Sequence, residues 1–117
     1  MKSLEDIRNY HAHIYYDGVS KQFAESLRSH LEIRFPDAVY GRWHDQPVGP
    51  HPDGSFQIEF PSELFQPIVS FLALNRGALV IIIHPNTGNA LMDHRDYAIW
   101  MGAVRPLNLR SLERTGT

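Results

Sequence analysis

The stretch "YHAHIYYDG", residues 10–18, decides the expected fold because it alternates in polarity and then turns. In a β-strand, successive side chains point to opposite faces of the sheet. The residues of one face are Tyr10, Ala12, Ile14 and Tyr16. The residues of the other face are His11, His13 and Tyr15. The stretch therefore predicts a strand over residues 10–16 that buries one face and sets two imidazoles side by side on the other.

The length and composition predict one compact domain. The chain has 117 residues, of which 43% are hydrophobic and 21% charged, so that it can bury a core. We expect a single domain over residues 1–117, with its core at about residues 8–102 and a polar C-terminal tail over residues 103–117.

Charge and cysteine content exclude several classes of function. The net charge is -2 and the 11 basic residues are spread along the chain, which argues against a nucleic-acid or polybasic membrane surface. There are no cysteines, hence no disulfide or thiolate metal site. The N-terminus lacks a signal-peptide core, and the longest apolar run, residues 78–83, is too short to span a bilayer. We expect a cytoplasmic protein that contacts neither nucleic acid nor membrane.

Two helices and three more strands follow the first strand in the predicted order. Ser20 is placed to cap a helix over residues 21–34, whose apolar side chains repeat every four residues and which Pro36 ends. A second helix is expected from residue 62 to about residue 75, where "NRG" stops it. The further expected strands cover residues 39–44, 55–60 and 79–84.

This order predicts an α+β fold, the ferredoxin-like βαββαβ sandwich, with a four-stranded antiparallel sheet and two helices on one face. We expect the first and third strands to lie side by side at the sheet centre and to run the same way. The fourth strand is expected at the edge, antiparallel to the first. The histidines would then lie on the face that the helices leave open.

The topology brings further histidines toward the HxH pair. The end of the fourth strand should lie near the start of the first, which places His84 close to His11, and the loop before the third strand, which carries His51, is expected at the same end. Two strand histidines at i and i+2 can share one metal ion, and imidazole is the commonest protein ligand for transition metals. We expect His84 as the third ligand, with His51 or Glu59 as alternatives. Without an ion, the imidazoles would be suited to acid–base work near neutral pH.

The segment after residue 89 is expected to form a short helix or a covering arm. It would fold His94 back over the open face and bring Trp100 as an apolar wall. Arg42, on the second strand, is a candidate for holding a substrate carboxylate, although a partly exposed structural arginine is the commoner role. Each of these residues taken singly also fits core packing or a solvated surface.

Five segments taken together resemble the DOPA 4,5-dioxygenase family, small extradiol-type ring-opening dioxygenases. They are "HAHIYYD", "GRWHDQPVGPHP", "FQIEFP", "LNRGALVIIIHPNTGN" and "DHRDYAIWMG", and they span residues 10–102. The resemblance implies a ferredoxin-like fold, a mononuclear non-haem iron(II) site, and a catecholic substrate that reacts with O2. Its motifs fall on His11 and His13 (HxH), His51 (PVGPH), His84 (HPxTG) and His94 (DH).

The expected roles combine the strand geometry with this resemblance. We expect His11, His13 and His84 to bind the metal, and the two remaining histidines, His51 and His94, to move protons during catalysis. The side chains that we expect to contact the substrate are Tyr15, Tyr40, Arg42, Trp43, Glu59 and Trp100.

Two other functions fit the same residues. Three histidines are also a usual zinc set, which favours a zinc-dependent enzyme such as a hydrolase. Alternatively, the chain is a metal-free, dimeric ferredoxin-like protein that binds a small ligand. A homodimer is expected, and it is compatible with all three functions.

Overall fold

The structure, a computed structural model, describes residues 1–113. It is an α+β fold built on a five-stranded antiparallel sheet in the order β2-β3-β1-β4-β5. The strands are β1 (Asn9–Tyr16), β2 (Val39–Tyr40), β3 (Gly54–Phe60), β4 (Val80–Asn86) and β5 (Ile99–Met101). The α-helices of the described chain are α1 (Lys21–Arg34), α2 (Phe65–Asn75), α3 (Ala90–Arg95) and α4 (Arg110–Glu113), with 3-10 turns at Leu4–Asp6 and Ser62–Leu64.

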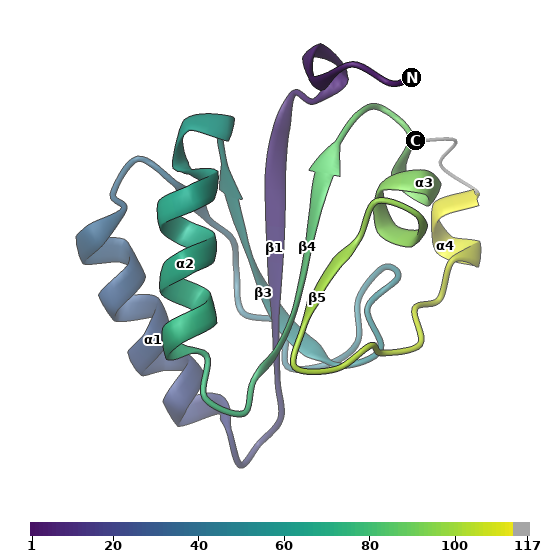
Figure 1. The fold of residues 1–117 in the computed structure, drawn as a ribbon. Helices are drawn as coiled ribbons and strands as arrows, with labels where there is room; N and C mark the ends of the chain where they lie inside the picture. Colours follow the sequence, from purple (N-terminus) through teal and green to yellow (C-terminus); the bar gives the residue numbers. More distant parts are fainter. Residues whose placement is uncertain (114–117) are drawn as a thin grey trace.

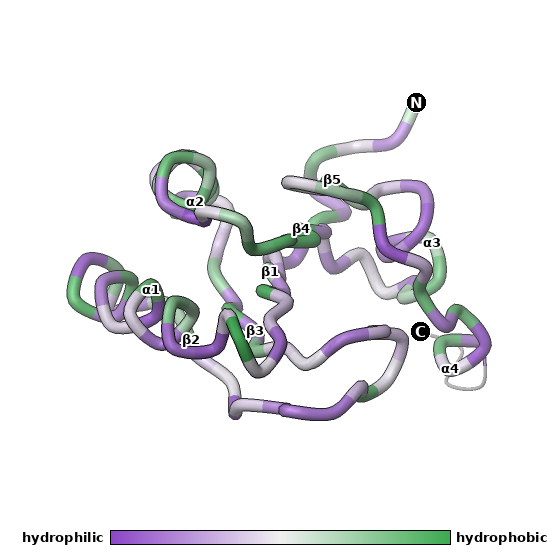
Figure 2. Tube along the Cα trace, turned by 90° about the horizontal axis from the view of Figure 1, so that it is seen from below, coloured by the Kyte–Doolittle hydropathy of each residue, from purple (hydrophilic) through white to green (hydrophobic). Residues whose placement is uncertain are grey.

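Two layers enclose the sheet (Figures 1 and 2). Helices α1 and α2 cover one face, whereas the long loop before β3 and the C-terminal helices α3 and α4 lie on the other side. The antiparallel sheet and the two helices on one face confirm the α+β prediction. The second face, which α1 and α2 leave free as predicted, is covered by these C-terminal and loop segments; only the C-terminal cover was expected from the sequence.

The central strand β1 alternates as its sequence predicts. Ala12 and Ile14 are fully buried toward α1 and α2, in a core with Phe56 and Ile58 of β3. β1 lies between β3 and β4 and is covered on both faces, so His13 and Tyr15 on its other face are buried as well, and His13 is only 5% exposed.

The predicted strand directions and strand count need correction. β1 and β3 are antiparallel, with Tyr10 opposite Phe60 and Tyr16 opposite Gly54, so the two strands do not run the same way. A fifth strand, β5, pairs with β4, so the sheet has five strands and β4 is not at its edge. The short apolar stretch around Trp100 supplies this strand because it continues the ladder beside the apolar β4.

Helix boundaries follow local chemistry, with one exception. α1 covers the predicted residues 21–34. The turn that leads into it is held by Asp17, whose carboxylate accepts from the backbone N–H groups of Val19 and Ser20. The Ser20 side chain makes no capping bond to the helix. α2 ends at Asn75, and Gly77 then adopts φ +58°, the left-handed conformation that glycine supplies after a helix.

The second strand is shorter than predicted, and part of the C-terminal tail packs on the domain. β2 is only two residues long, and His44 reaches β3 through an isolated bridge to Ser55. Up to residue 113 the predicted polar tail packs on the domain: the backbone N–H of Asn108 donates to the Pro50 carbonyl (2.8 Å) and Leu112 is buried. The rest of the predicted tail, residues 114–117, lies outside the described residues.

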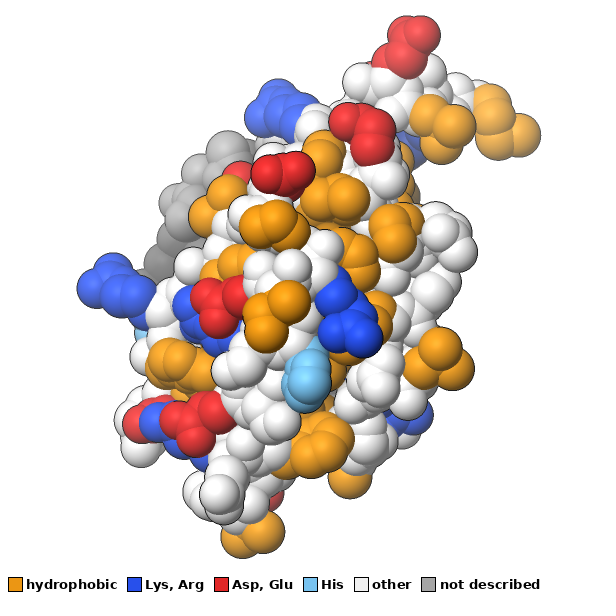
Figure 3. All heavy atoms as spheres, turned by 90° about the vertical axis from the view of Figure 1, so that its left-hand side faces the viewer, with side chains coloured by type: hydrophobic (Ala, Val, Ile, Leu, Met, Phe, Trp, Pro, Cys, Tyr) orange, Lys and Arg blue, Asp and Glu red, His pale blue; other side chains and the backbone are white. Residues whose placement is uncertain are grey.

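The outer surface of α1 and α2 mixes acidic, basic and hydrophobic side chains (Figure 3). Among the described residues, no helix is long and apolar enough to cross a membrane.

Candidate metal centre

Two histidines enter the site from the central strand. His11 and His13 lie on the face of β1 opposite the helix-facing core, as the alternation predicts. The side chain of His11 is 21% exposed, whereas His13 is buried. His11 therefore marks the more open side of the site and His13 its interior.

The neighbouring strand supplies a third histidine. In the antiparallel register, His84 of β4 stands directly opposite His11, as predicted. The Nε2 atoms of His13 and His84 lie 3.1 Å apart. Two nitrogen ligands about 2.0–2.1 Å from one ion, at the angles of octahedral or tetrahedral coordination, are separated by about 2.9–3.4 Å. The spacing of these two atoms therefore fits a shared ion.

His51 joins the cluster by a different route from the predicted one. Because β3 is antiparallel to β1, the loop before β3 emerges beside Tyr16 and not beside His11. The loop instead folds over the sheet face, and the His51 ring lies 4.0 Å from the His13 ring, centroid to centroid. The Arg105 guanidinium donates two hydrogen bonds to the Asp53 carboxylate, 2.8 and 3.0 Å, and so ties the C-terminal segment to this loop.

His94 comes from α3, as the expected covering segment implied. Its ring centroid lies 4.0 Å from that of His84 and 6.0 Å from that of His13. The preceding residue, Asp93, is buried and accepts from the backbone N–H (2.9 Å) and the hydroxyl (2.6 Å) of Thr87. This carboxylate fixes the turn between β4 and α3, and thereby the position of His94 over the sheet.

The buried imidazoles are held in the neutral form. Burial lowers the pKa of His84 to about 3 and that of His51 to about 4, with nearby histidines adding to the effect. Burial likewise places the pKa of His13 well below its usual value and lowers the pKa of His94. Neutral imidazoles carry the lone pair that a metal ion or a proton needs.

Three of the histidines have hydrogen-bond partners typical of metal ligands. His11 Nε2 lies 2.8 Å from a carboxylate oxygen of Glu59, and His84 Nδ1 lies 2.9 Å from the Pro85 carbonyl oxygen. His94 Nδ1 lies 2.7 Å from the carbonyl oxygen of Ala90. Because these oxygens accept hydrogen bonds, each bonded ring nitrogen carries the proton and leaves the other nitrogen free.

Two overlapping groups within the described residues can hold a metal ion. The first comprises His11, His13 and His84, and the second comprises His13, His51 and His94; in each, the ligand atoms all lie within 4.8 Å of one another. The donor set of neutral imidazoles fits iron, zinc or another divalent transition metal. The geometry thus gathers all five histidines that the sequence singled out.

Comparison with known proteins identifies the family of this chain. The family model described as "Dopa 4,5-dioxygenase family" matches residues 10–111. The chain belongs to the Dopa 4,5-dioxygenase family. A relative from Amanita muscaria, named DOPA 4,5-dioxygenase, is 39% identical over 92% of this chain, and an uncharacterized 21.2 kDa protein from Botryotinia fuckeliana is 36% identical over 87% of it.

A solved structure is similar to this chain in both fold and sequence. The crystal structure of a "putative dioxygenase" from Nostoc punctiforme superposes with a TM-score of 0.96 at 40% identity, covering 98% of this chain and 99% of that one. The fungal relatives are longer: this family member spans 50% of the Amanita protein and 62% of the Botryotinia protein.

The predicted substrate contacts divide between the two faces of the sheet in this family member. Trp100 pairs with Ile82 in register, and its ring lies 6.2 Å from that of Tyr15, so both belong to the histidine side. Tyr40 and Trp43 instead pack against the core beneath the helices, Trp43 at 4.7 Å from the Phe56 ring. They do not line the cluster, because Tyr40 pairs with Ile58 and Trp43 contacts Phe56, both residues of the helix-side core.

Of the two charged residues predicted to contact the substrate, one lies at the histidine cluster and the other does not. Glu59 lies at the cluster, bound to His11. Arg42 follows the end of β2 and is exposed. The second strand that was expected to carry Arg42 beside the site is not formed at that position, since only residues 39 and 40 belong to it.

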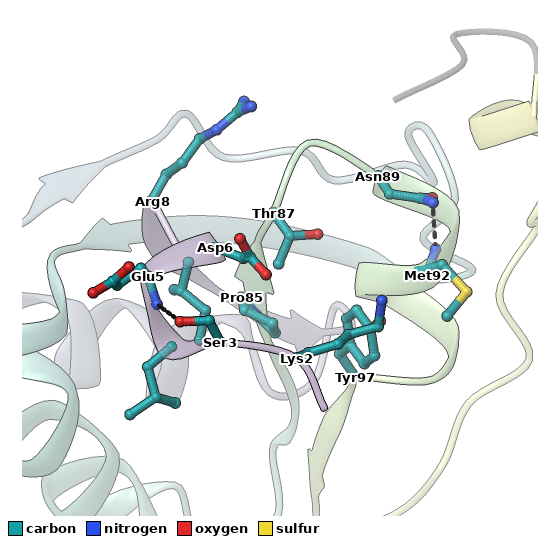
Figure 4. A pocket seen from close by; sticks show the side chains of 12 residues that line it. Lys2, Ser3, Glu5, Asp6, Arg8, Pro85, Thr87, Asn89, Met92 and Tyr97 are labelled. Carbon is teal, nitrogen blue, oxygen red and sulfur yellow. Dashed lines mark hydrogen bonds between the residues drawn. The ribbon is translucent and has the colours of Figure 1, made fainter.

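A large cavity near the N-terminus is not lined by the histidines. It has a volume of about 840 Å3 and lies between the N-terminal arm and the turn from β4 into α3, with Lys2, Arg8, Thr87, Met92 and Tyr97 among its lining residues (Figure 4). Pro85, which lines this cavity, directly follows His84 of the histidine cluster in the sequence. The chemistry of the five histidines, and not the cavity volume, identifies the candidate site.

Three supporting contacts were not predicted from the sequence. They are the Glu59–His11 bond, the Asp93–Thr87 bonds, and the Tyr15 hydroxyl 2.7 Å from His51 Nδ1. A partial signal was present for Asp93, which sits beside His94 in the "DH" pair. The other two contacts join different strands and loops, and local spacing carries no sign of them.

Proposed function

We propose that this family member is a metal-dependent extradiol ring-cleaving dioxygenase that acts on a catecholic, DOPA-like substrate with O2. The observation that carries the proposal is the buried cluster of five histidines, with two Nε2 atoms 3.1 Å apart, in a chain of this family. The catechol would supply the electrons that reduce O2. Both oxygen atoms would enter the product as the ring carbon–carbon bond beside the two hydroxyls breaks.

The metal proposed for the site is iron(II), held by His11, His13 and His84. When bound, the ion would supply the coordination positions at which a catechol and O2 meet. His84 can offer Nε2 and His11 can offer Nδ1, since their other ring nitrogens are engaged by Pro85 and Glu59. Glu59 supports this role because a carboxylate behind a ligand imidazole raises its basicity.

The protein groups beside these ligands fit the proton transfers of ring cleavage. A catechol must lose a proton to bind through both oxygens, and His94, whose Nδ1 donates to Ala90, keeps Nε2 as an acceptor. His51 faces the same space from the opposite loop. Trp100 supplies an aromatic wall on the histidine side.

Iron content and oxygen uptake test the proposal together. The protein is purified anaerobically with iron(II), its metal content is measured by elemental analysis, and oxygen consumption is followed with DOPA and simpler catechols. We expect bound iron, oxygen uptake and a ring-opened product identified by mass spectrometry. Zinc-loaded protein is the control and should consume no oxygen, because zinc has no redox chemistry.

Two results would overturn the proposal. Hydrolytic activity of the zinc form, with no oxygen uptake by the iron form, would favour the zinc enzyme. A fully stable protein that binds no metal would favour the ligand-binding alternative. The ferredoxin-like topology and the homodimer stay predictions.

A further inference from the structure

We propose that Tyr15 is a positioning residue that fixes the tautomer of His51, so that His51 presents an N–H donor, and not a lone pair, to the histidine cluster. The Tyr15 oxygen lies 2.7 Å from His51 Nδ1. Both side chains are buried, with Tyr15 3% and His51 7% exposed. The two side chains therefore hydrogen-bond to each other and not to bulk water.

The direction of this hydrogen bond follows from the donors available. A tyrosine hydroxyl keeps its proton at neutral pH, so Tyr15 is able to donate. Within residues 1–113, His51 Nδ1 is the one hydrogen-bond partner of this hydroxyl. A buried hydroxyl that donates nowhere loses the free energy of a hydrogen bond, so Tyr15 donates to Nδ1.

A lone pair on Nδ1 puts the proton on the other ring nitrogen. A neutral imidazole carries one proton, so with Nδ1 accepting from Tyr15, His51 Nε2 is protonated. Since Nδ1 is engaged and Nε2 holds a proton, neither nitrogen of this tautomer is available to a metal ion. The assignment therefore favours the ligand group of His11, His13 and His84 over the group that includes His51.

The other covering histidine has the opposite arrangement. His94 Nδ1 donates to a backbone carbonyl, which leaves an unprotonated Nε2. The His51 and His94 rings lie 6.0 Å apart, and their centroids lie 4.0 and 6.0 Å from that of His13. Toward the cluster, His51 thus presents an N–H donor and His94 presents an acceptor nitrogen. The hydrogen bond from Tyr15 to His51 causes this difference.

The consequence for catalysis rests on the proposed function, whereas the tautomer does not. In ring cleavage, the His51 N–H would donate to an oxygen of the bound substrates while His94 accepts the catechol proton. Tyr15 would act through His51 without contacting the reacting atoms.

The test is the tautomer of His51 in 15N-histidine-labelled, metal-free protein, read from two-bond 15N–1H correlation spectra near neutral pH. The His51 signals are assigned with a His51→Gln variant. We expect Nδ1 to be unprotonated and Nε2 protonated in the parent protein, and a loss of that preference in Tyr15→Phe. The matched control is Tyr16→Phe, which removes the neighbouring hydroxyl on the opposite face, where it donates to Asp45.

Metal binding and kinetics give two further readouts. Tyr15→Phe should still bind one metal ion per chain but lower kcat, on the order of tenfold or more, with KM changed less. Tyr16→Phe should leave kcat unchanged.

A proton on Nδ1 of His51 in the parent protein overturns the inference, as does an unchanged tautomer in Tyr15→Phe. The expected tautomer shift in a protein that cleaves no catechol would support the inference and refute the proposed function. The two failures are therefore distinguishable.

Discussion

The Nε2 atoms of His13 and His84 lie 3.1 Å apart, although the two residues are 71 positions apart in the chain. They come from adjacent antiparallel strands and share one face of the sheet. Both histidines are buried beside the isoleucines of β4. At this separation one metal ion can be coordinated by both Nε2 atoms, which compensates for the burial of two polar groups.

Replacing both strand histidines should abolish metal binding without unfolding the protein. In the double variant His11→Ala, His13→Ala we expect elemental analysis to find no bound metal, because the proposed site loses two of its three ligands. Circular dichroism should show a folded chain, since both side chains face away from the helix-side core. His30→Ala, on the exposed side of α1, is the control and should keep its metal. Metal bound at parent stoichiometry in the double variant would contradict the assignment.

Glu59→Gln should weaken metal binding while keeping the shape of the site. The amide removes the negative charge behind His11, and we expect metal affinity to fall about 10–100-fold. Competition with a chromophoric chelator measures this change. Glu63→Gln, which alters an exposed residue of the following 3-10 turn, should have no effect. An equal effect of both variants would indicate general electrostatics and no specific support for His11.

The metal-free protein should lose stability as the pH falls below about 6.5. The unfolded chain takes up protons on its histidines near pH 6.5, whereas His51 stays neutral to about pH 4 and His84 to about pH 3 in the fold. The unfolded state therefore binds more protons in this window, and each histidine lowers the free energy of unfolding by about 1.4 kcal/mol per pH unit. The loss should level off below the folded-state values.

Urea unfolding of the metal-free protein at pH 7.5, 6 and 5 measures that loss. His51→Gln, which cannot titrate, should flatten the dependence, whereas His30→Gln should not change it. A stability that is constant across these values would show that the buried histidines do not titrate differently in the two states.

Trp43→Ala should reduce stability and leave metal binding intact. Trp43 packs on Phe56 and Tyr16 under the helices, so we expect a loss of about 2–3 kcal/mol for this partly buried aromatic side chain. Thermal unfolding measures it, and elemental analysis should find the metal retained. Trp100→Ala, on the histidine side, is the contrasting variant, and we expect it to lose activity. A loss of metal from Trp43→Ala would show that the two faces are coupled.

Much of the secondary structure was predictable because it depends on local periodicity. The alternation in residues 10–16 correctly placed Ala12 and Ile14 toward the helices and His13 away from them. The four-residue apolar repeat fixed α1, whose bounds agree with the prediction. The fifth strand was missed because three residues carry no reliable period; only the neighbouring edge of β4 makes them a strand.

The sequence by itself determined which histidines share a strand face, because alternation in a β-strand is a property of the chain's own backbone. The tertiary structure alone decided the relative direction of β1 and β3, and with it the path of the loop that brings His51 across the sheet. It alone also decided which ring nitrogens are free. That depends on the hydrogen bond that His11 donates to Glu59 and on the one that His51 accepts from Tyr15, which join residues 48 and 36 positions apart. Contacts over such separations are fixed by packing of the whole domain, and no local spacing in the chain encodes them.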